Sequence, residues 1–349
     1  MTFHITCSTD NNYLQHCMAM LCSVFENNKE HTLHVHMLID SSLSSESRNL
    51  LKELSNRYSN WISFYDVNVN MVEGFDVSKA SYNGILRFPM LVYYRLLLTE
   101  YIPEDINTIL YLDCDIIVNG EISELFQINL SEYGVAAVKD YSPYSNRHRR
   151  KMGLGMQHAA FCSGVMVINL DYWRKQNVLG KFKEYFSIDK EYVLLPDQDA
   201  LNYVFRDHWL MLPYKWGKTP LSIAPLDRNQ KKFDIEEYAN NPKIFHFSSS
   251  IKPWMLVWQP DRKCYLQYLR LSQYPKPKFI KLNNKNRIKA HFSIIRYFIS
   301  KYIRPLVPDI IELLLRDILN IILFFVNIFR PAKMKEFLLK RWCQKYRLF

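Results

Sequence analysis

The sequence lacks the cysteine spacing of small zinc-binding domains and the leader pattern of secreted proteins. It has no Cys-x-x-Cys spacing, and its seven cysteines, an odd number, mostly sit inside apolar runs. We therefore expect reduced, packed thiols rather than a disulfide framework. Residues 1–10 show no basic segment followed by an apolar one, so they do not resemble a secretion signal. These observations predict a main domain that stays in the cytoplasm.

The sequence also lacks internal repeats and low-complexity linkers. The uncharged apolar stretch of its tail, Ile318–Phe329, is shorter than the roughly 20 residues that a membrane-spanning helix needs. With 349 residues, 48% of them hydrophobic, the chain can bury a sizeable core. We expect one large domain over residues 1–275 and an appendage over residues 276–349.

The basic excess lies entirely in this appendage. The whole chain has a net charge of +11, but residues 276–349 alone hold 17 Lys/Arg and 4 Asp/Glu, and the remainder is slightly acidic. A nucleic-acid partner is not expected, because no recognised binding motif accompanies the charge. Aromatic and apolar residues at helical spacing alternate with the basic ones, as in helices that lie on anionic membranes. A helical oligomerisation module is the alternative.

Strand and helix patterns alternate along residues 1–275. Helices are expected after the turn Thr9–Asn12, over Ser44–Tyr58 and Met90–Tyr101, and from the Asp197 region to about Phe205. Alternation of this kind predicts an α/β fold with a mostly parallel central sheet. The expected strands are His4–Ser8, His34–Ile39, Trp61–Val67, the stretch around Asp113 and Asp115, Gly134–Val138, Gly164–Leu170 and Lys243–Phe247.

Two aspartates, Asp113 and Asp115, interrupt the apolar run Ile109–Val118. Carboxylates are costly to bury without a cation, so the pair suggests a bound divalent metal. Together with His246 they would suit Mn²⁺ or Mg²⁺ bridging a diphosphate, and Lys252 could neutralise a phosphate oxygen. The alternatives are an Asx turn or a helix cap for the aspartates, a core histidine bonded to the backbone, and a solvated surface lysine. Because ligands collect beyond the carboxyl ends of strands, the Thr9–Asn12 turn, the aspartates, the Asp197–Asp199 loop and His246 are expected to share one crevice.

Five ordered motifs resemble glycosyltransferase family 8, and within it the bacterial lipopolysaccharide α-galactosyl- and α-glucosyltransferases. The motifs, spread over roughly residues 3–270, are Tyr93–Leu96, Tyr111–Asp115, Ser163–Leu170, Asp197–Asn202, and His246-Phe247 with Lys252–Trp254. The resemblance implies a GT-A fold, a UDP-sugar donor (UDP-galactose or UDP-glucose), Mn²⁺ and retention of anomeric configuration.

By position, the resemblance also implies roles for individual residues. Asp113, Asp115 and His246 would ligate the metal. The uracil and ribose pocket would be lined by Ser8, Asp10, Asn12 and Tyr13. Arg95 and Asp197 would hold the donor sugar, with Gln198 beneath its anomeric carbon, and the catalytic candidates are Gln198, Asp197 and Asp199. The implied donor and cofactor site comprises Ser8, Asp10, Asn12, Tyr13, Arg95, Asp113, Cys114, Asp115, Ser163, Asp197, Gln198, His246, Ser249 and Lys252.

Two positions depart from the family pattern. Cys162 stands where family members often have Asn, and Ser249 stands where they often have Gly. The first change replaces an amide by a thiol in the expected sugar site, and the second alters backbone access to the phosphate. Because Gln198 is a poor nucleophile, front-face attack is preferred over Asp199 as a nucleophile.

The expected function is transfer of a hexose from a UDP-sugar to a lipid-linked lipopolysaccharide core acceptor, on the cytoplasmic face of the bacterial inner membrane. The basic cluster Arg147–Lys151 would contact an anionic acceptor, or would be a solvated helix face. Alternatives are transfer to a protein or glycan primer, and a noncatalytic membrane scaffold with a nucleotide pocket. His34-x-His36 is interpreted as ordinary strand alternation rather than a metal site.

Overall fold

The computed structural model describes residues 2–75, 89–140, 154, 159–188, 195–219, 242–248, 251–255, 261–283, 286–287, 290–291 and 295. The chain divides into two units, Met1–Ile294 and Ile295–Phe349. All described residues except Ile295 belong to the first unit. The expected membrane helices, the cluster Arg147–Lys151 and Ser249 lie outside the described residues.

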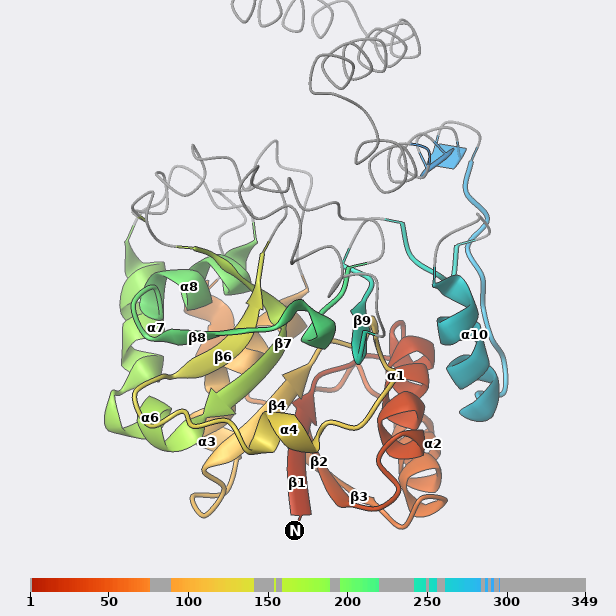
Figure 1. Ribbon diagram of the computed structural model, residues 1–349, viewed down its shortest axis with the longest axis horizontal. Coiled ribbons are helices and arrows are strands. Elements are labelled where there is room, and N and C mark those ends of the chain that lie inside the picture. The colour runs from red at the N-terminus through yellow and green to blue at the C-terminus, as the bar shows by residue number, and fades with distance from the viewer. Residues whose placement is uncertain are drawn as a thin grey trace, which may run out of the picture. The chain divides into compact units, whose positions relative to one another are not determined.

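A seven-stranded sheet forms the centre of the first unit (Figure 1). Its strand order is β3-β2-β1-β4-β7-β6-β8, and β7 alone runs antiparallel to the others. The predicted α/β class with a mostly parallel sheet is therefore confirmed. The strands are β1 (Thr2–Cys7), β2 (Thr32–Ile39), β3 (Trp61–Asp66), β4 (Thr108–Leu112), β6 (Val135–Lys139), β7 (Phe161–Asn169) and β8 (Trp209–Leu212).

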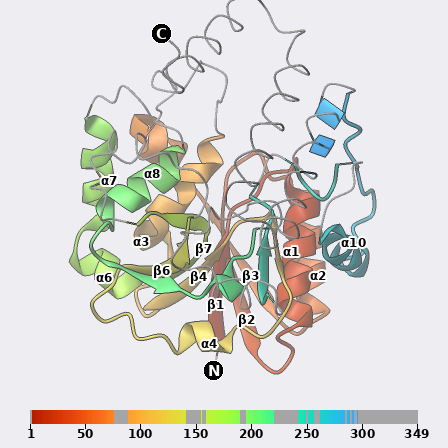
Figure 2. The same cartoon turned by 45° about the horizontal axis from the view of Figure 1, so that its top comes forward.

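Helices cover both faces of this sheet, one group on each side in the views of Figures 1 and 2. Helices α1 and α2 pack on one face, and η3, α3, α6, α7 and α8 pack on the other. The helices are α1 (Leu14–Glu26), α2 (Ser45–Asn56), α3 (Leu98–Tyr101), α4 (Ser123–Phe126), α6 (Leu170–Lys175), α7 (Val178–Ser187), α8 (Pro196–Val204) and α10 (Arg262–Leu271), with 3₁₀ helices η1 (Val69–Phe75), η3 (Met90–Leu97) and η4 (Tyr214–Trp216).

Helix α1 is buried along almost its whole length because α10 covers the side that faces away from the sheet. Gln15 donates to the Tyr265 hydroxyl (3.0 Å), and the His16 ring stacks on Trp254 with centroids 3.5 Å apart. The Lys252–Trp254 motif is thereby fixed against the first helix. This packing holds together two segments that are more than 200 residues apart in the sequence.

A second, two-stranded sheet pairs β5 (Ile116–Val118) antiparallel with β9 (Ile244–His246). Ile116 lies opposite His246, so the strand that follows Asp115 is directly bonded to the strand that ends in His246. This small sheet brings the aspartates and the histidine to one place.

The predicted helix Met90–Tyr101 begins as a 3₁₀ helix over Met90–Leu97 and continues as one α-helical turn, Leu98–Tyr101. Three residues per turn place Val92 and Arg95 on the same side of the helix, and both line the cavity described below. Four elements, β8, α6, α7 and α10, were not predicted from the sequence. In the described part of the chain, we find no helix with both the length and the apolar character needed to span a bilayer.

Candidate active site

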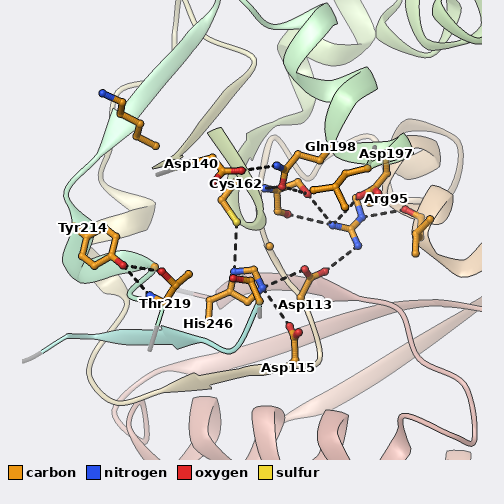
Figure 3. A pocket seen from close by; sticks show the side chains of 17 residues that line it. Arg95, Asp113, Asp115, Asp140, Cys162, Asp197, Gln198, Tyr214, Thr219 and His246 are labelled. Carbon is orange, nitrogen blue, oxygen red and sulfur yellow. Dashed lines mark hydrogen bonds and ion pairs between the residues drawn. The ribbon is translucent and has the colours of Figure 1, made fainter. Parts of the chain in front are cut away.

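A cavity of about 280 Å³ lies where β4 and β6 end (Figure 3). Its walls come from η3, the loop after β4, the first residues of β7, the start of α8, and β9. Three of the four segments that we expected to share a crevice contribute to it; the Thr9–Asn12 turn does not line it. The polar side chains of the wall are Arg95, Asp113, Asp115, Lys139, Asp140, Cys162, Ser163, Asp197, Gln198, Tyr214, Thr219, His246 and Ser248.

Asp113, Asp115 and His246 converge on one side of this cavity. The Asp113 amide donates to the Gly164 carbonyl (2.9 Å), and the Phe247 amide donates to the Asp115 carbonyl (2.9 Å), so the backbone fixes both aspartates. His246 Nε2 lies 3.3 Å from Asp115 Oδ1 and 3.6 Å from Asp113 Oδ2. The potential ligand atoms of the three residues all lie within 4.8 Å of one another.

Each carboxylate is anchored by one oxygen and presents the other to His246. Asp113 Oδ1 accepts hydrogen bonds from Arg95 Nη2 (2.8 Å) and from the Tyr111 hydroxyl (2.9 Å). Asp115 Oδ2 accepts one from Lys252 Nζ (2.6 Å). The buried Asp115 Oδ1 has no hydrogen bond of good geometry within the described residues. The carboxylates are therefore held in place with one oxygen each left for a ligand.

Two neighbours position the His246 ring: the Cys162 thiol contacts it, and Gly164 leaves room for it because it has no side chain. Its Nδ1 lies 3.4 Å from Cys162 Sγ, and a Cβ atom on Gly164 would overlap the ring. A proton on Nδ1, directed at the sulfur, leaves the Nε2 lone pair facing the carboxylates. The departure at Cys162 thus has a structural consequence: the thiol contacts the histidine ring.

The charges of the cluster are strongly coupled. Burial alone would raise the pKa of Asp115, but Lys252 and His246 outweigh it and lower that pKa well below its usual range. Burial alone would lower the pKa of His246, but Cys162 and Asp115 outweigh it and raise that pKa. The negative potential of the carboxylates therefore favours a positive charge at Nε2, whether that charge is a proton or a metal ion.

The donor set fits a divalent cation. Ligand atoms about 2.1 Å from an octahedral ion lie about 3 Å apart when they are adjacent. The two separations measured from His246 Nε2 are close to this value, and two carboxylate oxygens with one imidazole suit Mn²⁺ or Mg²⁺. The unbonded Asp115 Oδ1 is the atom whose burial a metal ion would explain.

A second group of side chains forms the facing wall. Arg95, only 7% exposed, contacts Asp113 and lies 3.3 Å from Asp197 Oδ2 through Nη1. Burial raises the pKa of Asp197 although Arg95 opposes the shift. Gln198 accepts from the Ser163 amide (3.0 Å) and donates to Asp140 Oδ2 (2.9 Å). Hydrogen bonds to the protein therefore fix both the carbonyl oxygen and the amino group of the Gln198 side chain.

The residues expected at the nucleotide lie at the same edge of the sheet but outside the cavity wall. Asp10 accepts from the Tyr13 amide (2.8 Å) and from Asn12 Nδ2 (3.2 Å), which forms the turn that begins α1. Cys114 Sγ donates to the Ser8 carbonyl (3.2 Å), which ties this turn to the aspartate loop. Asp113 and Asp115 contribute to a raised pKa of Tyr13, mainly an effect of burial. The turn is thus bonded directly to the loop that carries Asp113 and Asp115.

Two candidates take positions that the sequence analysis did not foresee. Asp199 is fully buried, accepts from the Leu195 amide (3.3 Å) at the start of α8, and does not line the cavity. Lys252 donates to Asp115 and to the Phe247 carbonyl (2.7 Å). Asp140, Tyr111 and Gly164 were not predicted as site residues. Tyr111 and Gly164 lie inside two of the five motifs, whereas Asp140 follows a strand without any motif.

The sequence profile described as glycosyl transferase family 8 matches residues 4–256, which include every residue of the Asp113–Asp115–His246 cluster. The chain belongs to glycosyl transferase family 8.

Relatives within this family are similar over most of the chain. General stress protein A of Bacillus subtilis is 30% identical, over 78% of this chain and 94% of its own length. Lipopolysaccharide 1,2-glucosyltransferase of Escherichia coli is 28% identical, over 72% of this chain and 73% of its own length. The crystal structure of galactosyltransferase LgtC in complex with donor and acceptor sugar analogs is 22% identical, with a TM-score of 0.65, and the match covers 83% of this chain and 100% of that one. The family's GT-A fold is thereby confirmed.

Replacing Gly164 by Ala tests the geometry of the metal candidates. The added methyl group would displace the His246 ring, so we expect Gly164→Ala to weaken Mn²⁺ binding by about 10- to 100-fold, measured by isothermal titration calorimetry. Gly74→Ala is the matched control, because a Cβ at Gly74 meets no atom within 4 Å. Equal Mn²⁺ affinity in both variants would contradict the assignment of His246.

Proposed function

We propose that this family 8 member is a retaining, Mn²⁺-dependent hexosyltransferase that moves galactose or glucose from a UDP-sugar to a lipopolysaccharide or lipooligosaccharide core. The observation that carries the proposal is the partly buried cluster in which Asp113 and Asp115 each present one oxygen to His246 Nε2. The lipopolysaccharide acceptor is supported by the name of the Escherichia coli relative. Both hexoses stay open, since one similar protein is named a glucosyltransferase and another a galactosyltransferase.

The side chains around the cluster have separable roles in this proposal. A bound divalent ion would supply positive charge to the departing diphosphate. Arg95 and Tyr111 hold Asp113 in place, and Lys252 holds Asp115. Two of the three N–H groups of Lys252 are used in its contacts with described residues, which leaves one for a phosphate oxygen.

The facing wall would hold the sugar and its reacting carbon. Gln198 is fixed by Ser163 and Asp140, so its neutral amide can bind sugar hydroxyls but is a poor nucleophile. Asp197 is paired with Arg95, and Asp199 is buried away from the cavity. These positions support attack from the leaving-group side, with a donor phosphate oxygen accepting the proton of the incoming hydroxyl. A glycosyl adduct trapped on Asp199 would instead support double displacement.

A donor-hydrolysis panel tests the metal-dependent step. UDP-galactose and UDP-glucose are offered to the full chain with Mn²⁺, with Mg²⁺ and with a chelator. Asp113→Asn and Asp115→Asn should lower turnover by about 100-fold or more, because each removes a charged ligand, and chelation should do the same to the unmodified protein.

The matched control for this panel is Asp66→Asn. Asp66 is an exposed carboxylate on β3 that pairs with Arg48, so the substitution makes the same change in charge away from the cavity. Equal turnover in all three variants would remove the metal mechanism. Offering lipooligosaccharide, glucan and protein acceptors with the preferred donor separates the core-oligosaccharide acceptor from a primer, and no turnover with any donor would favour a scaffold.

Membrane association through residues 276–349 belongs to the same proposal, as does a peripheral position on the cytoplasmic face of the inner membrane. Its support is the basic, aromatic composition of that segment. A shortened protein must keep the residues just after 275, because some of them contact the catalytic domain. Lys278 exchanges hydrogen bonds with the Gln15 side chain, and the Ile280 amide donates to the Trp254 carbonyl (2.9 Å).

We therefore compare the full chain with residues 1–294 in a flotation assay. The full chain should float with vesicles that contain anionic lipid and less so as salt rises, whereas the shortened protein should stay in the dense fraction. Neutral vesicles serve as the control. Identical partitioning of the two proteins would reject membrane binding by the tail.

A further inference from the structure

Three histidines meet on one face of the central sheet, and none of them lines the cavity. His4 on β1 lies beside His34 on β2 in the parallel register, and His36 is two residues further along β2. Their neighbours in the two strands, such as Phe3, Ile5 and Val35, point to the opposite face and pack with α1 and α2. The histidines therefore share the other face of the sheet.

The three rings are close enough to hold a single ion. Ring centroids are 3.9 Å apart for His34 and His36, 5.2 Å for His4 and His36, and 5.6 Å for His4 and His34. His4 Nδ1 lies 3.0 Å from His36 Nε2. One nitrogen from each ring lies within 4.8 Å of one nitrogen from each of the others.

Hydroxyl groups on β3 fix two of the rings from behind. His34 Nε2 lies 2.8 Å from Ser63 Oγ, and His36 Nδ1 lies 2.9 Å from the Tyr65 hydroxyl. A histidine that ligates a metal through one nitrogen usually has the other nitrogen hydrogen-bonded in this way, because that bond sets the tautomer and the ring orientation. The contacts with β3 leave His34 Nδ1 and His36 Nε2 as the nitrogens for a ligand.

The surroundings keep the rings neutral, as metal ligands must be. Burial lowers the pKa of His34 to about 4 and that of His36 to about 3. Burial also lowers the pKa of His4, and the negative charge of Asp105 opposes that shift. The Asp105 charge acts on the cluster in the direction that favours a bound cation.

We propose that His4, His34 and His36 form a second metal site, selective for a borderline ion such as Zn²⁺. Three imidazoles without a carboxylate ligand suit zinc, whereas Mn²⁺ and Mg²⁺ prefer oxygen ligands. Three protein ligands leave the fourth position of a tetrahedral ion for water, which can reach the partly exposed His4 and His34. The site lies at the amino-terminal half of β1, whereas Asp113 follows the carboxyl end of the parallel neighbouring strand β4.

An ion in this position links β1 to β2, so it acts on stability rather than on the sugar. An ion that binds only the folded state raises the apparent unfolding temperature. The inference does not depend on the proposed transferase function. A hydrogen-bonded histidine chain without metal is the competing explanation of the same geometry.

Zinc titration in a full-length Asp113→Asn/Asp115→Asn background separates this site from the cavity. We expect one Zn²⁺ per chain by competition with a chromophoric chelator, and a visible Co²⁺ spectrum typical of nitrogen ligation. Adding His34→Gln should weaken zinc affinity by at least about 100-fold, and adding Ser63→Ala should weaken it by about 10-fold. Zinc should raise the unfolding temperature by several degrees, and His34→Gln should abolish that rise.

His208→Gln is the matched control, since His208 is an exposed histidine whose ring contacts Tyr172 and not the cluster. Far-UV circular dichroism in the presence of chelator shows whether the His34→Gln protein remains folded. If that protein is unfolded, the zinc affinity of the milder variant Ser63→Ala is compared instead. No stoichiometric zinc in the aspartate-free background would overturn the proposal. So would equal zinc affinity in the His34→Gln and His208→Gln proteins.

Discussion

The mutual approach of two partly buried carboxylates to one buried imidazole is the constraint on which the site depends. Like charges at such short range repel each other strongly in a low-dielectric interior, and each also gives up hydration. The protein offsets this with Arg95 beside Asp113 and Lys252 beside Asp115. Those cations occupy only one oxygen of each carboxylate, so the negative potential between the remaining oxygens is kept for a ligand.

Much of the surrounding structure serves that arrangement. The β5–β9 pairing places His246 against the aspartate loop, and Gly164 leaves room for its ring. The 3₁₀ form of η3 aims Arg95 into the cavity, where it reaches Asp113 and Asp197 together. Asn202 on α8 donates to the Phe161 carbonyl and accepts from the Phe161 amide, which docks α8 on β7 and so fixes Gln198. The site is therefore preorganised before any substrate binds.

Sequence patterns predicted the elements that carry a clear periodicity or a clear capping residue. Strand β2 and helix α2 fall within two residues of the expected bounds, because alternation and the Ser44 cap mark them. Helix α10 was missed, since the pairing that buries it against α1 joins distant parts of the chain. The 3₁₀ form of η3 was missed too, because apolar spacing over a short segment does not separate 3.0 from 3.6 residues per turn.

In the candidate site, too, some features could be predicted from the sequence and others could not. Asp113, Asp115 and His246 were named as one set because their chemistry is recognisable and motifs mark their places. The contact of Lys252 with Asp115 and that of Cys162 with the His246 ring were not predicted. Both depend on side-chain geometry, which the spacing of residues in the sequence does not show. His34-x-His36 was interpreted as ordinary strand alternation for a similar reason: alternation along β2 was visible in the sequence, whereas the neighbouring position of His4 in β1 was not.

Anomalous diffraction from a crystal grown with Mn²⁺ and UDP would decide whether Asp113, Asp115 and His246 hold a single metal ion. We expect one manganese peak in the cavity, within bonding distance of Asp113, Asp115 and His246. A manganese ion bound to the nucleotide without contact to His246 or to either aspartate would contradict it.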